Sequence, residues 1–209
     1  MNRLPSLLRQ HIAAFRLLLV FTVVCGIIYP VVMWGISQAA FHNQANGSLV
    51  SYHGQVVGSS LLCQEYVSAS GSPLPRYFQG RPSNATSGDA KDYGCDAGYS
   101  AAANLGPNST QLTTTVKQLQ KQVAAFDGVT AAQVPPDAVT SSASGLDPDI
   151  SPAYAAIQVS RVATARNLPV ATVRTLVAKY TRGRDAWIFG EPAVDVLQLN
   201  LALDSLKQG

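Results

Sequence analysis

The chain has 209 residues, of which 47% are apolar and 13% are charged, whereas average soluble domains carry roughly a quarter of charged residues. This composition excludes a disordered or collagen-like chain. The formal net charge is +3, but the excess lies in Arg3, Arg9 and Arg16, and the charges after residue 40 balance. Because a nucleic-acid-binding face needs clustered Lys and Arg, nucleic acid is not an expected partner.

Residues 17–36 (LLLVFTVVCGIIYPVVMWGI) carry no charge, and as a helix they would span about 30 Å, the thickness of a bilayer core. We therefore predict a cytoplasmic tail over 1–16, a transmembrane helix over 17–40 and an extracytoplasmic domain over 41–209. Two alternatives are a signal peptide cleaved near Ala40 and a buried helix of a soluble domain. The stretch is longer than a usual signal peptide core and has no polar stripe, which favours a retained anchor.

The predicted orientation follows from the arginines. All three N-terminal arginines precede the span, and the next charged residue after it is Glu65. Because cytoplasmic flanks are enriched in Lys and Arg, the N-terminus is expected in the cytoplasm and the domain outside, in a single-pass protein of the inner or plasma membrane.

The segment after the span predicts a β-hairpin, with strands 49–52 and 55–57 around the turn His53-Gly54. Residues 68–110 are rich in Gly, Ser, Ala, Asn and Pro and show no periodicity. We interpret them as an ordered loop that buries aromatic side chains, with a disordered loop as the alternative. The aromatic candidates are Tyr77, Phe78, Tyr93 and Tyr99.

Helical patterns dominate the rest of the chain. Apolar residues recur on one face over 110–126, Ser151-Pro152 is a typical helix start for a helix to about residue 167, and a further helix is expected over 170–180. Residues 187–189 (WIF) look strand-like, and 194–203 favours a helix after a short strand. Strands are few and do not alternate regularly with helices, so the expected class is α+β.

Residues for catalysis or metal binding are mostly missing from the sequence. It contains no phosphate-binding glycine loop, no zinc-binding His motif and no nucleophile elbow. His11, His42 and His53 are too far apart under the predicted topology to share a metal. The sequence Asp147-Pro148-Asp149 fits a turn before the helix at Ser151 better than a cation site. We expect neither catalytic residues nor a metal site, and no enzymatic activity of the chain by itself.

Two of the three cysteines, Cys63 and Cys95, lie outside the membrane under the predicted topology. An oxidising exterior favours a disulfide between them, which would contribute about 3–4 kcal/mol in the chain-entropy model. Two buried thiols are the alternative. Cys25 lies within the span and is expected to stay free.

The sequence resembles the KdpC subunits of bacterial potassium-transporting P-type ATPases. The resemblance lies in residues 26–30 (GIIYP), 77–83 (YFQGRPS), 104–109 (NLGPNS) and 142–152 (SASGLDPDISP), and it ends with 190–192 (GEP) and 199–204 (LNLALD). It covers nearly the whole chain in order. The sequence departs from the family where 100–103 (SAAA) replaces a common Gly-Gly-Ser stretch, and in the loop over 84–99.

The resemblance implies an accessory subunit in an ATP-driven complex for high-affinity potassium uptake. Its implied partners are a channel-like potassium-selective subunit, a P-type pump subunit, a small single-span subunit and the lipid bilayer. It also implies a catalytic-chaperone effect that raises the affinity of the pump subunit for ATP, the only cofactor implied. Because the predicted topology leaves only the short tail in the cytosol, an effect transmitted through the membrane helix is easier to reconcile with the sequence than direct ATP contact.

The rival hypothesis is a freestanding membrane-anchored ligand-binding protein or enzyme outside the cytoplasm. Small and kink-forming residues in the span favour close packing against a partner helix instead. The predicted helix-packing residues are Gly26, Pro30 and Gly35. Within the resembling motifs and the helices beside them, the candidates for partner-facing residues are Gly80, Arg81, Asn104, Gln158 and Arg161.

Overall fold

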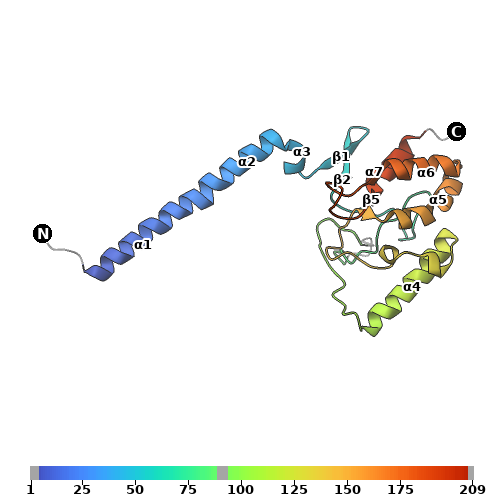
Figure 1. The fold of residues 1–209 in the computed structure, drawn as a ribbon, viewed down its shortest axis with the longest axis horizontal. Helices are drawn as coiled ribbons and strands as arrows, with labels where there is room; N and C mark the ends of the chain where they lie inside the picture. Colours follow the sequence, from blue (N-terminus) through green and yellow to red (C-terminus); the bar gives the residue numbers. More distant parts are fainter. Residues whose placement is uncertain (1–4, 89–93, 207–209) are drawn as a thin grey trace. The chain divides into compact units, whose positions relative to one another are not determined.

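The structure is a computed structural model that describes residues 5–88 and 94–206, and the chain divides into the units Met1–Ser48 and Leu49–Gly209. The first unit is almost entirely helical. Helix α1 (Ser6–Val23) continues through one π-helical turn, η1 (Val24–Ile28), into α2 (Tyr29–Ala40), as Figure 1 shows. Phe41, at φ −134°, ends this helix, and a single short helix α3 (His42–Ala45) follows.

The π-turn explains how the helix continues through Pro30. Proline has no backbone N–H to donate, and its ring clashes with the carbonyl four residues earlier, here that of Gly26. The turn Val24–Ile28 is wider than an α-helical turn and contains that carbonyl. Such a local widening takes a carbonyl out of the regular ladder, so the proline is accommodated without ending the helix.

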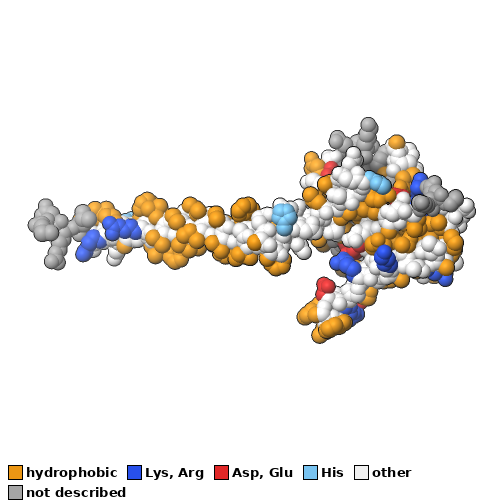
Figure 2. Space-filling view, turned by 90° about the horizontal axis from the view of Figure 1, so that it is seen from above, with side chains coloured by type: hydrophobic (Ala, Val, Ile, Leu, Met, Phe, Trp, Pro, Cys, Tyr) orange, Lys and Arg blue, Asp and Glu red, His pale blue; other side chains and the backbone are white. Residues whose placement is uncertain are grey.

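The helix from Ser6 to Ala40 has 35 residues and is long and apolar enough to cross a membrane. At 1.5 Å per residue it extends about 50 Å, more than the roughly 30 Å of a bilayer core. None of its most apolar stretch is buried, and Figure 2 shows hydrophobic side chains along its length with basic side chains gathered near its N-terminal end. The predicted apolar helix is confirmed, and it begins at Ser6, well before Leu17.

The second unit begins with the predicted hairpin. Strand β1 (Leu49–Tyr52) pairs antiparallel with β2 (Gln55–Ser59), with an irregularity between Val50 and Ser51. The turn residues His53 and Gly54 both have positive φ, at 49° and 79°. Two such residues give the turn whose twist matches that of the flanking strands, which is why glycine follows the histidine here.

The long segment between β2 and the next helix contains no helix or named strand in its described part, as predicted. It is ordered around Phe78, which is fully buried. Tyr77 is half-buried, but the prediction for Tyr99 was wrong, because its side chain is 52% exposed. Tyr93 lies outside the described residues.

The predicted helices are confirmed. They are α4 (Thr110–Asp127), α5 (Pro152–Arg166) and α6 (Val170–Lys179). The Ser109 and Ser151 hydroxyls accept hydrogen bonds from the first turns of α4 and α5, and Gly128 ends α4 in a left-handed conformation. Two short 3-10 turns, η2 (Ala131–Gln133) and η3 (Pro136–Ala138), connect α4 to the segment before α5.

A small antiparallel sheet has the order β3-β5-β4, with β3 (Asp149–Ile150), β4 (Thr181–Arg182) and β5 (Ala193–Asp195). Helix α7 (Val196–Ser205) follows β5 directly, as predicted for 194–203. The predicted strand over 187–189 is wrong. These residues form the exposed end of the loop between β4 and β5, closed by an isolated bridge between Asp185 and Phe189.

The core of the second unit lies between its helices and the small sheet. Buried side chains of α5, α6, α7 and β5 meet Phe78, which enters from the long loop. Removing a buried phenylalanine side chain typically costs about 3–5 kcal/mol, so this one residue fixes the loop to the helices. The fold is α+β, as expected. The largest fully buried apolar side chains are those of Phe78, Ile150, Val162, Val173, Val194, Leu197, Leu199 and Leu203.

Candidate functional site

Buried amide side chains of two helices hold the segment 75–79, which begins in a turn and is here called the clamped segment. Asn200 of α7 is fully buried, its Oδ1 accepts from the backbone N–H of Phe78 at 2.9 Å, and its Nδ2 donates to the carbonyl of the same residue at 2.9 Å. One asparagine therefore satisfies both backbone groups of the residue whose ring fills the core.

Gln158 of α5 does the same for the next residue. Its Oε1 accepts from the N–H of Gln79 at 2.7 Å, and its Nε2 donates to the Gln79 carbonyl at 3.1 Å. The Gln158 side chain is fully buried. An unpaired backbone group in such a place costs about 1–3 kcal/mol, so two consecutive residues of a loop are fixed almost as firmly as in a sheet.

Arg161, one turn further along α5, completes the clamp. Its guanidinium donates to the carbonyls of Pro75 and Tyr77 at 2.6 and 2.9 Å and pairs with Asp127 of α4 at 2.7 Å. The two side chains are 7% and 2% exposed. Burial raises the pKa of the Asp127 carboxyl, and the hydrogen bond from Arg161 opposes that rise. The ion pair joins α4 to α5 directly, and Arg161 also bonds the clamped segment.

A second cluster holds the other side of the clamped segment. Arg166 donates to the carbonyl of Arg76 at 2.6 Å and to Asp204 of α7 at 2.8 Å. The Tyr77 hydroxyl donates to the same carboxylate at 3.1 Å, and burial raises the pKa of that hydroxyl. Two of the motifs quoted for the family resemblance, 77–83 and 199–204, meet at this cluster. Their separation along the chain did not reveal that they are in contact.

These contacts show where two of the predicted partner-facing residues lie in the domain. Gln158 has no exposed side-chain surface, and the side chain of Arg161 is engaged with four groups inside the domain. Both hold the clamped segment in place. A direct contact of either residue with a partner stays a prediction.

Two of the other three candidates, Gly80 and Arg81, directly follow the clamped segment. Gly80 and Arg81 line a hollow of about 890 Å³ beside α4, and Asn104 lines a separate hollow of about 640 Å³. Arg81 donates to Asp147 at 2.9 Å and to the carbonyl of Thr140. Asn104 is exposed and has φ +49°. Gly80 and Arg81 thus adjoin the groups that Gln158 and Arg161 hold, because Gln79 and Asp127 line the same hollow, whereas Asn104 lines the second one.

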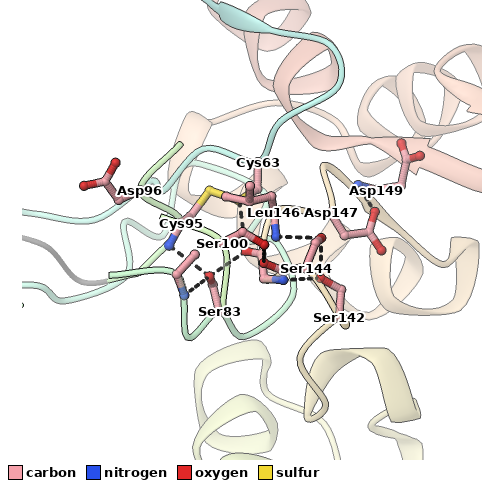
Figure 3. The surroundings of a disulfide bond; sticks show 12 residues. Cys63, Ser83, Cys95, Asp96, Ser100, Ser142, Ser144, Leu146, Asp147 and Asp149 are labelled. Carbon is pink, nitrogen blue, oxygen red and sulfur yellow. Dashed lines mark hydrogen bonds between the residues drawn. A yellow bond between two sulfur atoms is a disulfide. The ribbon is translucent and has the colours of Figure 1, made fainter. Parts of the chain in front are cut away.

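The structure joins Cys63 and Cys95 by a disulfide, with Cα atoms 5.9 Å apart. Figure 3 shows the hydrogen bonds around it. The Ser83 hydroxyl accepts from the N–H of Cys95 at 2.9 Å and donates to the Gly145 carbonyl at 2.6 Å, and the N–H of Cys63 donates to the Leu146 carbonyl at 3.0 Å. Three segments distant in sequence are thereby tied together at one point.

Glycine is required at position 145 of this junction. Its φ is +73°, and a Cβ atom would lie 2.5 Å from the carbonyl oxygen of Ala101. Side chains at this position would force the loops apart.

Free Cys25 lies in the long helix of the first unit and is exposed.

No constellation for catalysis or metal binding emerges. Within residues 5–88 and 94–206, no three His, Cys, Asp or Glu side chains gather in a way that could hold a metal ion. His53 lies in the hairpin turn and stacks edge-on against Tyr52. Asp147 accepts from the backbone N–H of Asp149, as the predicted turn requires.

In the first unit, the helix-packing candidates are accessible from outside. A Cβ atom added at Gly26 or at Gly35 would meet no atom within 4 Å. Gly26 and Pro30 are one turn apart and share a face, whereas Gly35 lies about 140° around the helix from Pro30. The helix thus offers two places for close approach, on different faces.

Comparisons with known proteins agree with this architecture. The family model described as K+-transporting ATPase, c chain, matches residues 11–205. A potassium-transporting ATPase KdpC subunit of Sorangium cellulosum is 50% identical over 194 residues, covering 93% of this chain and 96% of that protein. The KdpC subunits of Gemmatimonas aurantiaca and Paraburkholderia phymatum are 48% and 45% identical, over 88% and 99% of this chain and over 86% and 100% of their own lengths.

A helix long and apolar enough to cross a membrane, followed by an α+β domain, describes a broad class of proteins. The family match over residues 11–205 makes the class specific. The chain belongs to the KdpC family. The resemblance seen in the sequence motifs is confirmed.

Proposed function

We propose that this chain is an accessory subunit of a potassium-transporting ATPase complex, in which it contributes binding energy rather than chemistry. The observation that carries the proposal is the division of the chain: the polar groups of the clamped domain are used internally, whereas the long helix exposes an apolar surface with accessible glycines. A helix of this kind packs closely against other helices in a bilayer.

Its proposed partners are the channel-like potassium-selective subunit, the P-type pump subunit and the small single-span subunit implied by the family. A tagged full-length chain, expressed with these subunits and purified in mild detergent, should retain them at a fixed ratio through repeated washing. Recovery of the chain by itself, while the same subunits copurify with each other, would contradict the assembly role and favour a freestanding ligand-binding protein.

We propose that the N-terminus faces the cytoplasm and the domain lies outside. Arg9 and Arg16 lie near the N-terminal end of the long helix, and the residues that follow it up to Ser59 carry no Lys or Arg. A reporter enzyme that is active only outside the cytoplasm, fused after Gly209, should be active. Activity of a cytoplasm-specific reporter at the same position would reverse the topology.

Any effect on the ATP affinity of the pump subunit is proposed to act through the membrane helix. A subunit that binds one conformation of a pump more tightly shifts the pump toward that conformation, and nucleotide affinity follows by linkage. The purified full-length chain by itself should neither hydrolyse ATP nor bind it saturably. Saturable ATP binding by the chain in the absence of its partners would place a nucleotide site on this subunit and overturn the indirect mechanism.

A further inference from the structure

The loop between β4 and β5 ends in three consecutive apolar side chains that almost nothing in the domain covers. Trp187 is 93% exposed, Ile188 is 72% exposed and Phe189 is 68% exposed. We refer to residues 187–189 as the apolar tip. A contiguous exposed group of large apolar side chains is uncommon on a soluble surface and marks a contact surface. From this tip we propose that the domain dips into the lipid bilayer surface beside its own membrane helix.

The backbone of the tip is already prepared for an apolar surrounding. The N–H of Asp185 donates to the carbonyl of Phe189 at 2.9 Å, and the N–H of Phe189 donates back at 2.9 Å. The N–H groups of Trp187 and Ile188 donate to the carbonyls of Arg184 and Asp185 at 3.3 and 3.2 Å. Because lipid cannot pair backbone polar groups, a segment that enters it must satisfy its own N–H groups, and the N–H groups of all three tip residues are paired within the loop.

The conformation of the tip holds its side chains outward at a cost. Ala186 and Trp187 have φ of +47° and +63°, a left-handed region that is unfavourable for residues with a Cβ atom. Such strain persists where the surrounding structure imposes it, and it concentrates at functional places. Here the bridge between Asp185 and Phe189 imposes it, and the result is an indole that projects away from the domain.

The residues at the base of the loop fit the polar side of a bilayer interface. Arg184 pairs with Glu191 at 2.8 Å across the loop, and Arg182 pairs with Asp149. Both arginine side chains remain about half or more exposed, at 47% and 66%. Trp and Phe next to a ring of paired charges match the order of acyl boundary and polar headgroups, and the arginine side chains can reach lipid phosphates from there.

The connection between the long helix and the domain is short. The long helix ends at Ala40 and the domain begins at Leu49, so the connecting residues span at most about 28 Å even when fully extended. If the helix crosses a membrane, as the proposed function requires, the bilayer is the nearest large apolar phase to every part of the domain. A short tether raises the local concentration of that surface, so a small apolar tip is sufficient for contact.

Tryptophan fluorescence of the full-length chain tests this inference, because the chain has only Trp34 and Trp187. The Trp34→Phe variant leaves the tip as the sole indole, and Trp187→Phe leaves the one in the membrane helix. Each variant is reconstituted into vesicles of phosphatidylcholine and phosphatidylglycerol, with and without lipids brominated at shallow acyl positions. We expect Trp187 emission to be blue-shifted and to be quenched by the brominated lipid.

Two further variants keep the test specific. In the Trp34→Phe background, Ile188→Asp should abolish the quenching and shift the emission to longer wavelength, whereas Leu61→Ser, at an apolar position exposed to 61% elsewhere in the domain, should change neither. Emission of Trp187 that is unaffected by brominated lipid while Trp34 is quenched would overturn the inference and leave the membrane anchor intact. The tip would then be a contact for a protein subunit, which loss of copurification in the Ile188→Asp variant would reveal. Absence of Trp34 quenching would overturn both proposals.

Discussion

Asn200 of α7 and Phe78 of the long loop are joined by two hydrogen bonds of 2.9 Å, one from each amide atom of the asparagine to the backbone of the phenylalanine. The Phe78 ring lies fully buried in the same place. A polar contact and an apolar contact therefore fix Phe78, although 122 positions separate it from Asn200 in the sequence.

Replacing Asn200 with alanine should destabilise the domain strongly. Both backbone groups of Phe78 would be left buried without partners, at about 1–3 kcal/mol for each. We expect the free energy of unfolding of the full-length chain in detergent, measured with urea, to fall by about 3 kcal/mol. Lys117→Ala, at an exposed position of α4, is the control and should change it by less than about 1 kcal/mol. Equal effects of the two variants would refute the clamp.

Arg161 should not tolerate lysine. A lysine keeps the charge but cannot reach Asp127 and the carbonyls of Pro75 and Tyr77 at once, because it lacks the planar fork of donors. We expect Arg161→Lys to lower the free energy of unfolding by about 2–4 kcal/mol. Arg174→Lys, at an exposed position of α6, should be nearly neutral. A neutral Arg161→Lys would show that the buried pair adds no stability beyond its charge.

The disulfide should contribute to stability in the range expected for its loop. Cys63 and Cys95 are 32 residues apart, so Cys95→Ser should lower the free energy of unfolding by about 3–4 kcal/mol in the chain-entropy model. Cys25→Ser, in the long helix, should leave it unchanged. Peptide mapping without reductant should recover a linked pair containing Cys63 and Cys95. Complete alkylation of both before reduction would contradict the linkage.

Asp149 predicts a specific pH dependence. Burial raises the pKa of its carboxyl, against the attraction of Arg182 and with repulsion from Asp195 and Asp147. Because the folded state then binds the proton more tightly than the unfolded state does, this carboxyl lowers stability as pH rises from its ordinary pKa of 3.8 through the raised value. The loss of folding stability is complete at pH values above the raised pKa and absent below pH 3.8.

Asp149→Asn removes this titration, so its free energy of unfolding relative to the unmodified chain should increase from pH about 4 to about 7. Urea unfolding of both chains across that range measures the difference. Asp185→Asn, at an exposed position, serves as the control. A difference that stays constant with pH would mean that Asp149 titrates alike in the folded and unfolded states.

The sequence predicted the parts of this fold that depend on local chemistry. Ser109, Ser151 and Gly128 mark helix ends by their own hydrogen bonds or backbone freedom, so the helices could be placed without tertiary information. The hairpin followed for the same reason, because His53 and Gly54 specify the turn. The long apolar helix followed from composition alone.

Contacts between distant segments could not be predicted in this way. Gln158 and Arg161 look like surface residues of an ordinary helix, and only the fold brings the loop backbone to them. Residues 187–189 have the composition of a strand, but Ala186 and Trp187 adopt left-handed conformations that turn the chain before a ladder can form. Local propensity gave way to tertiary context at this loop.

Copurification of variants with added bulk in the long helix tests whether this helix binds the partner subunits. Gly26→Leu adds bulk on the face shared with Pro30, where overpacking costs about 1–3 kcal/mol. Ile36→Phe adds bulk about 100° or more away from Gly35 and from Pro30 and is the matched control. Quantitative copurification of the complex in mild detergent should fall several-fold with Gly26→Leu and stay unchanged with Ile36→Phe. Full recovery of the complex with Gly26→Leu and with Gly35→Leu would contradict the claim and move the essential contacts to the domain.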